Sequence, residues 1–158
     1  MAGLNNVASE LESIARELRR QADGELFREL TGAMRRGVEP AKEQIRAGLK
    51  PHLPDRYAEV LAADLDLAVS VSTAGREPGV SLIARTRSGK RRSLRRIDTG
   101  QLRHPGPGND REHWYTQEVH PGWFTGPARD ADPEVTRNLE AALERVADQV
   151  DRKAARRG

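Results

Sequence analysis

The amino-terminal part of the chain repeats apolar residues at the spacing of an amphipathic helix. The first stripe consists of Val7, Leu11, Ile14 and Leu18. Its steps of three or four residues match an α-helix with one buried face. Ser9 and Glu12 have the spacing of a capping box, so the pattern predicts a helix that begins near Ser9.

Two further helical stretches follow, and breaks separate them. Apolar residues recur at helical spacing after Asp23-Gly24 and again over 41–49. Pro40 either kinks the earlier helix or opens the later one, because proline lacks the N–H that a helix interior needs. The stretch "KPHLPD" at 50–55 has two prolines and predicts a break, after which Asp55 can cap a short helix.

The hydrophobic period changes to two near residue 65. In "LDLAVSVST" large apolar residues alternate with polar or small ones, which predicts a strand with one buried face. "GREPG" at 75–79 predicts a turn and "VSLIART" at 80–86 a second strand, so the two runs form a hairpin. "WYTQEV" at 114–119 predicts a third strand. Together these strands predict one small antiparallel sheet.

The last predicted element is a helix over 132–152. Asp132 is a favourable N-cap, and Pro133 suits the first helical position. One apolar stripe continues over about four turns. It consists of Val135, Leu139, Leu143, Val146 and Val150.

These elements predict an α+β fold in which a long N-terminal helical region and a C-terminal helix pack on a small antiparallel sheet. The chain has 158 residues, a length that suits one domain. Within a single domain over 1–158, the helical region covers 1–64 and the strands 65–119. An aromatic turn over 120–131 then leads into the C-terminal helix.

The residues that could carry chemistry do not form a recognisable catalytic pattern. The chain has no Cys, which excludes thiol catalysis, disulfides and thiolate metal sites. Neither a P-loop nor a nucleophile elbow is present. The histidines at 104, 113 and 120 lack the tight spacing of metal ligands. We therefore expect no enzymatic activity, no metal, no cofactor and no small-molecule substrate.

Hydropathy argues against a membrane protein. No run approaches the roughly 18 consecutive apolar residues of a membrane span. The N-terminus "MAGLNNVASELE" lacks the basic and then apolar order of a signal peptide. The sequence predicts a protein without a membrane partner that is made in the cytoplasm.

Charge is concentrated in one segment, which we call the basic linker, at 85–103. It has eight Lys or Arg residues and one acid, Asp98, for a net charge of +7, whereas the remainder has 19 basic and 23 acidic residues, a net −4. Such a segment can attract phosphate or an acidic protein surface, or it can be a solvated hairpin tip. No aromatic residue lies within the run to stack on bases. The candidate contacts are Arg87, Lys90, Arg91, Arg92, Arg95 and Arg96.

Four of the six aromatic residues lie within 111–134. Trp114 and Tyr115 belong to the predicted third strand, whereas Trp123 and Phe124 stand among glycines and prolines that interrupt regular structure. We expect Trp114, Trp123 and Phe124 to fasten the aromatic turn by burial, since each ring can bury about 150–250 Å². The alternative is that they anchor a neighbouring subunit, because Trp is enriched at interfaces.

The stretch from residue 102 onward resembles a known family. The order "RHP", "GN", "W..Q.V.PGWF" and then an amphipathic helix is similar to the carboxy-terminal half of small neck proteins of actinobacterial long-tailed phages. These resemble the lambda Z-like tail-completion family, also described as a minor tail component or head-tail joining family. The matching residues are Arg103, His104, Pro105, Gly108, Asn109, Trp114, Gln117, Val119, Pro121, Gly122, Trp123 and Phe124.

The resemblance extends over roughly 53–150 and implies a structural role. Members have an α+β fold and form a ring in the head-to-tail connection, where stopper, completion and terminator proteins stack. It implies a non-enzymatic virion protein, assembled in the host cytoplasm, that contacts its own copies and adjacent neck and tail-tube proteins. Separately, we expect the arginines of the basic linker to face either an acidic neighbour or passing DNA, without base specificity. A hexamer would match a sixfold tail. The basic linker departs from the family pattern, which leaves a small nucleic-acid-binding protein that uses 85–103 as the alternative function.

Overall fold

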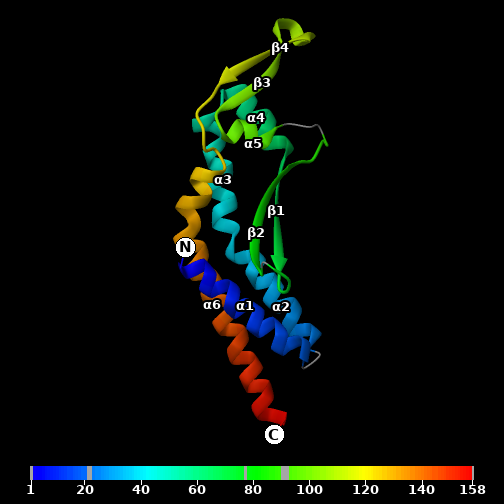
Figure 1. Ribbon diagram of the computed structural model, residues 1–158, viewed down its shortest axis with the longest axis vertical. Helices are drawn as coiled ribbons and strands as arrows, with labels where there is room; N and C mark the ends of the chain where they lie inside the picture. Colours follow the sequence, from blue (N-terminus) through cyan, green and yellow to red (C-terminus); the bar gives the residue numbers. More distant parts are fainter. Residues whose placement is uncertain (1, 21–22, 77, 90–92, 158) are drawn as a thin grey trace. The chain divides into compact units, whose positions relative to one another are not determined.

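The computed structural model describes residues 2–20, 23–76, 78–89 and 93–157 (Figure 1). The predicted α+β class is confirmed, because helices accompany two small antiparallel sheets of two strands each. In chain order the elements are α1 (Ala2–Arg20), α2 (Gly24–Gly37), α3 (Glu39–His52), α4 (Asp55–Asp64), β1 (Leu65–Ser72), β2 (Gly79–Thr86), α5 (Leu94–Asp98), β3 (Gln101–Gly106), the 3₁₀ turn η1 (Pro107–Asn109), β4 (Asp110–Glu118) and α6 (Thr125–Arg157).

The chain divides into two compact units. Unit 1 consists of Met1–Pro40, Ala68–Ile83 and Asp132–Gly158, and unit 2 of Ala41–Leu67 and Ala84–Ala131. Each unit has its own set of buried apolar side chains.

In unit 1, helix α1 begins earlier than the sequence pattern predicts. It starts at Ala2, so the expected start near Ser9 was wrong and Ser9 lies inside the helix. Val7, which precedes Ser9, is already buried, and the stripe continues through Leu11 and Leu18. The apolar face therefore extends upstream of the capping-box pattern, and burial of that face outweighs the local cap signal.

Helix α2 begins where the sequence predicts. The side chain of Asp23 accepts a hydrogen bond from the N–H of Leu26 at 3.0 Å, which makes Asp23 the N-cap. The second carboxylate oxygen of Asp23 pairs with Nζ of Lys153 at 2.9 Å. Gln149 also donates to Glu29 at 3.0 Å, so polar contacts fasten the last turns of α6 to α2.

Prolines mark the ends of the middle helices. Pro40 is the second residue of α3, and of the two alternatives the one that opens a new helix is correct. Pro51 is the penultimate residue of α3, and the break predicted over 50–55 is confined to the two residues before α4. Asp55 is the first residue of α4 rather than its cap, because Pro54 occupies the N-cap position without a side-chain hydrogen bond.

The predicted hairpin of β1 and β2 is confirmed. The two strands form a two-stranded sheet, visible in green in Figure 1. Leu65 and Leu67 at the start of β1 are buried, whereas Val69 and Val71 are only partly covered. The alternation that identifies the strand therefore corresponds to full burial only in its first half.

The predicted third strand does not join this hairpin. It is β4, which begins at Asp110 and pairs antiparallel with β3, so the expectation of one three-stranded sheet was wrong. Strand β3 was not predicted, because "QLRHPG" has no period of two and contains Pro105. Proline is tolerated in a two-stranded ribbon because each strand has an outer edge that needs no ladder partner. We call this sheet the β3–β4 ribbon.

Helix α6 also starts earlier than predicted. It begins at Thr125 and continues through Pro133, so Asp132 is an interior residue and not the N-cap. The predicted turn over 120–131 is accordingly confined to the residues between β4 and Thr125. Gly122 adopts φ 86°, a left-handed conformation that favours glycine and allows the chain to reverse there.

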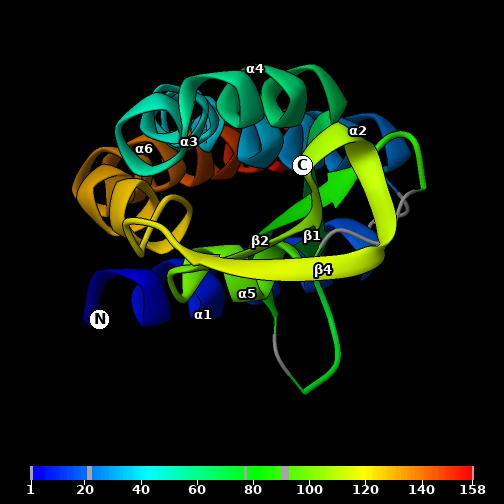
Figure 2. The same cartoon turned by 90° about the horizontal axis from the view of Figure 1, so that it is seen from above.

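Trp123 lies in the core of unit 2. It is 1% exposed, and its ring meets that of Phe124 edge to face with 5.7 Å between the ring centroids. A Cβ atom at Gly48 of α3 would lie 3.1 Å from the carbonyl oxygen of Trp123 and 2.8 Å from Cγ of Pro127. The first turn of α6 therefore approaches α3 closely (Figure 2). In the same unit, α5 contacts β3. Within the described residues, no helix is both long and apolar enough to cross a bilayer.

The expected burial holds for Trp123 but was wrong for Trp114, which lies on the exposed strand β4. The two tryptophans therefore make a matched pair for a stability test. We expect Trp123→Ala to lower the free energy of unfolding by about 3–5 kcal/mol, because it leaves a cavity in unit 2. Trp114 is 48% exposed, so Trp114→Ala should cost less than about 1 kcal/mol. Chemical denaturation of the isolated chain measures both values, and an equal effect of the two substitutions would contradict the assigned core.

Candidate functional site: an arginine-lined hollow

The structure describes three of the six predicted basic contacts and places them on two segments. Arg87 is exposed just after β2, and Arg95 and Arg96 are exposed on α5. Lys90, Arg91 and Arg92 lie outside the described residues. The candidate site is therefore built from the two ends of the basic linker and from what lies beside them.

Asp64 holds the first end of the basic linker. Its carbonyl oxygen accepts a hydrogen bond from the N–H of Arg87 at 2.7 Å. Its carboxylate accepts one from the N–H of Ser88 at 2.8 Å and another from the Ser88 hydroxyl at 2.7 Å. The last residue of α4 thereby fixes the chain as it leaves β2.

Asp98 holds the other end, together with the aromatic turn. Its Oδ1 accepts hydrogen bonds from the N–H groups of Phe124 at 2.8 Å and Thr125 at 3.2 Å. Its carbonyl oxygen accepts a third from the N–H of Gly122 at 2.8 Å. The one acid of the basic linker is thus placed at the N-terminus of α6, where the helix dipole and unpaired N–H groups favour a carboxylate.

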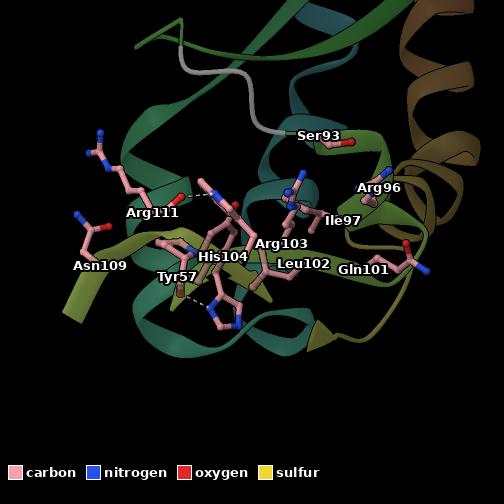
Figure 3. A pocket seen from close by; sticks show the side chains of 12 residues that line it. Tyr57, Ser93, Arg96, Ile97, Gln101, Leu102, Arg103, His104, Asn109 and Arg111 are labelled. Carbon is pink, nitrogen blue, oxygen red and sulfur yellow. Dashed lines mark hydrogen bonds between the residues drawn. The ribbon is translucent and has the colours of Figure 1, made fainter. Parts of the chain in front are cut away.

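A hollow of about 930 Å³ opens between α4, α5 and the β3–β4 ribbon in unit 2 (Figure 3). Its described lining includes three arginines and one histidine but neither Asp nor Glu. In the view of Figure 3, Arg103 lies between Arg111 and Arg96. The lining residues are Tyr57, Ser93, Arg96, Ile97, Gln101, Leu102, Arg103, His104, Pro105, Asn109, Arg111 and Trp114. We call this feature the arginine-lined hollow.

The arginines of the hollow have no carboxylate partner among the described residues. The ion pairs that the described residues form involve other side chains, and none includes Arg96, Arg103 or Arg111. A guanidinium group carries five N–H donors in a planar fork that matches phosphate or carboxylate. Three such groups around one concavity create a positive potential that attracts anions.

Trp114 contributes an aromatic surface beside these charges. The guanidinium carbon of Arg103 lies 5.2 Å from the centroid of the Trp114 ring, a cation–π arrangement. The indole Nε1 donates a hydrogen bond to the carbonyl of Arg111 at 2.9 Å. Arg103 pairs with Thr116 in the ribbon register, so Trp114 is its diagonal neighbour on the same face.

His104 lies on the other face of the β3–β4 ribbon from Arg103 and Trp114, although all three line the hollow. His104 pairs directly with Tyr115, and their rings stack with centroids 6.2 Å apart. The Nδ1 of His104 donates to the carbonyl of Pro105 at 2.9 Å. Tyr115 is 52% exposed, and every residue of β4 after Asp110 is exposed.

The histidines of β3 and β4 make local contacts. No cluster of three or more potential ligands occurs among the described residues. His113 and Asp110 form a local pair in which Nδ1 of His113 lies 2.7 Å from the carboxylate. Hydrogen bonds from His113 and from the N–H of Glu112 hold the pKa of Asp110 below its usual value. These contacts hold the backbone at the start of β4.

Sequence reasoning recognised only part of the hollow. It selected Arg96 and Trp114, which line it, and also Arg87 and Arg95, which do not. Arg103, His104 and Arg111 were not selected as contacts, although "GPGN" at 106–109 is a turn signal between two arms of a hairpin. Read as a hairpin turn, it would have placed Arg103 near Trp114.

Comparison with known proteins provides no further assignment, since no protein family, no curated protein and no solved structure matches this chain.

The cap made by Asp98 can be tested separately from any ligand. Asp98→Ala removes the acceptor of two N–H groups, and we expect a loss of about 1–2 kcal/mol in the free energy of unfolding. Asp98→Asn keeps an oxygen at the same position and should recover most of that loss. Chemical denaturation of the two variants measures the difference, and equal stability of Asp98→Ala and the unsubstituted chain would contradict the cap.

Proposed function

We propose that the protein is a non-enzymatic structural component of the head-to-tail connection of a long-tailed double-stranded DNA phage or a related tail-like particle. It forms a ring, with a hexamer as the preferred count, in the stopper, completion or terminator layer. Its partners are its own copies and the adjacent neck and tail-tube proteins, and its location is the virion. The proposal rests on the pattern of matching residues between Arg103 and Phe124.

The position of the pattern in the fold supports this proposal. The matching residues lie in one contiguous piece of unit 2, from β3 through η1 and β4 to the residue before α6. Several have specific local roles: Pro105 and Trp114 are register partners, and Trp123 is in the core. A pattern that coincides with one structural piece is more informative than residues scattered over the chain.

The exposure of the β3–β4 ribbon supports an assembly role. An isolated two-stranded sheet is marginally stable in water, and its open edges can pair with another chain. On the face opposite Trp114, the ribbon presents Tyr115, which is 52% exposed. Aromatic residues are enriched in the buried centre of protein interfaces. A neighbouring subunit in a ring would cover such a surface, and repetition of one interface closes the ring.

The direct test is the composition of purified particles. Quantitative mass spectrometry of intact virions should find the protein at the copy number of one ring, about six for the preferred symmetry. Its absence from intact particles would contradict the proposal. A monomeric state of the isolated protein would not contradict it, because ring formation can require contact with an adjacent ring of the particle.

A substitution on the ribbon tests whether this surface assembles. We expect Tyr115→Ser to reduce particle yield in a complementation assay by at least about tenfold, since it removes an exposed aromatic ring from the proposed interface. Val60→Ser on α4 is the matched control, because Val60 is also exposed, at 46%, and lies outside the ribbon. Equal yields from the two variants would argue against the ribbon as the assembly surface.

A further inference from the structure

We propose that the arginine-lined hollow binds single-stranded nucleic acid, with its arginines on the phosphates and Trp114 stacked on a base. This inference goes beyond the structural role and does not require ring formation. It also differs from the alternative drawn from sequence, since it uses Arg103, Arg111 and Trp114 rather than the basic linker alone.

The arginines provide the phosphate contacts. Arg96 comes from α5, Arg103 from β3 and Arg111 from β4, so three separate elements converge on one concavity. The one acid in the linker, Asp98, directs its Oδ1 to the N-terminus of α6. Arg96, Arg103 and Arg111 thus form no ion pair with a carboxylate of the described residues, and an external polyanion can pair with them.

Trp114 provides a surface for a base. Its Nε1 hydrogen bond to Arg111 and the guanidinium of Arg103 fix the orientation of the indole. About half of the side chain nevertheless remains exposed, at 48%. A preoriented aromatic ring beside cationic groups is the arrangement by which proteins bind unpaired bases and their backbone together.

These features favour a nucleic acid strand over an acidic protein surface or a duplex. An acidic peptide would use the arginines but would leave the exposed indole without a planar partner. In a duplex the bases stack on one another, so a side-chain ring cannot reach a base face without unstacking the helix. The volume of about 930 Å³ falls within the roughly 300–1,000 Å³ of sites that hold small ligands, which is sufficient for a nucleotide.

The binding test uses the full chain and a fluorescein-labelled oligo(dT) of twelve nucleotides. Arg96→Gln, Arg103→Gln and Arg111→Gln combined should weaken binding at least about tenfold at 50 mM salt. The slope of log affinity against log salt should fall by about 2, because about 0.7 of a counterion is released per phosphate contact on a single strand. The matched control replaces Arg46, Arg56 and Arg129 by Gln, three exposed arginines of unit 2 outside the hollow.

Trp114 is tested by two substitutions. Trp114→Ala should weaken oligo(dT) binding roughly 5- to 150-fold, the range for loss of one stacked base. Trp114→Phe keeps an aromatic ring and should recover a large part of the affinity. In the unsubstituted chain, oligo(dT) should also protect Trp114 from acrylamide quenching, because Trp123 is already buried and contributes little to that signal.

Several results would overturn the proposal. One is the absence of oligo(dT) binding at 50 mM salt, and another is equal loss of affinity in the hollow and control triple variants. Tighter binding of poly-Glu than of oligo(dT), without an effect of Trp114→Ala, would assign the hollow to an acidic protein. If the protein binds duplex and single-stranded DNA with equal affinity and Trp114→Ala has no effect, the hollow binds only the phosphate backbone. Thermal melting of each variant verifies that it is folded.

Discussion

The arrangement of unit 2 depends on the hydrogen bonds that the carboxylate of Asp98 accepts at the start of α6. A helix begins with N–H groups that have no partner within the helix, and the residues just before Thr125 are Gly, Trp and Phe, which offer no side-chain acceptor. Asp98 supplies that acceptor from a short helix 26 residues earlier in the chain. The same residue accepts the N–H of Gly122, so it fixes the turn that places Trp123 in the core.

Local pattern was sufficient for elements that bury a continuous stripe or alternate along a strand. The helices that carry Leu11, Leu30 and Leu139, and the β1–β2 hairpin, were predictable because their signals lie within the element itself. The starts of α1 and α6 were not, since local cap signals at Ser9 and Asp132 compete with burial and with the distant Asp98. Strand β3 had no local signal, because it is defined by its partner β4 and not by its own sequence.

The candidate site shows the same division. The run of arginines and the cluster of aromatic residues can both be recognised in the sequence. Their juxtaposition is not visible, because Arg103 and Trp114 meet only through the register of two strands joined by η1. The basic linker therefore supplies two of the three arginines of the hollow, Arg96 and Arg103, whereas Arg111 and Trp114 come from β4. No aromatic residue lies within the basic linker in the sequence. In the fold, however, the ring of Trp114 lies beside Arg103 of that linker.

The register of the β3–β4 ribbon restricts how the sequence can change. An irregularity between Pro105 and Gly106 lets Gly106 pair with Asp110 while Pro105 still pairs with Trp114. Because successive side chains alternate between faces, a one-residue insertion or deletion that shifted this pairing would exchange the faces of Trp114 and Tyr115. The turn is restricted in residue type as well, because Gly108 and Asn109 have positive φ values of 74° and 63°. Its length is restricted by the register. An insertion or deletion of one residue in the turn at 106–109 would therefore put Tyr115 on the face that Trp114 now occupies.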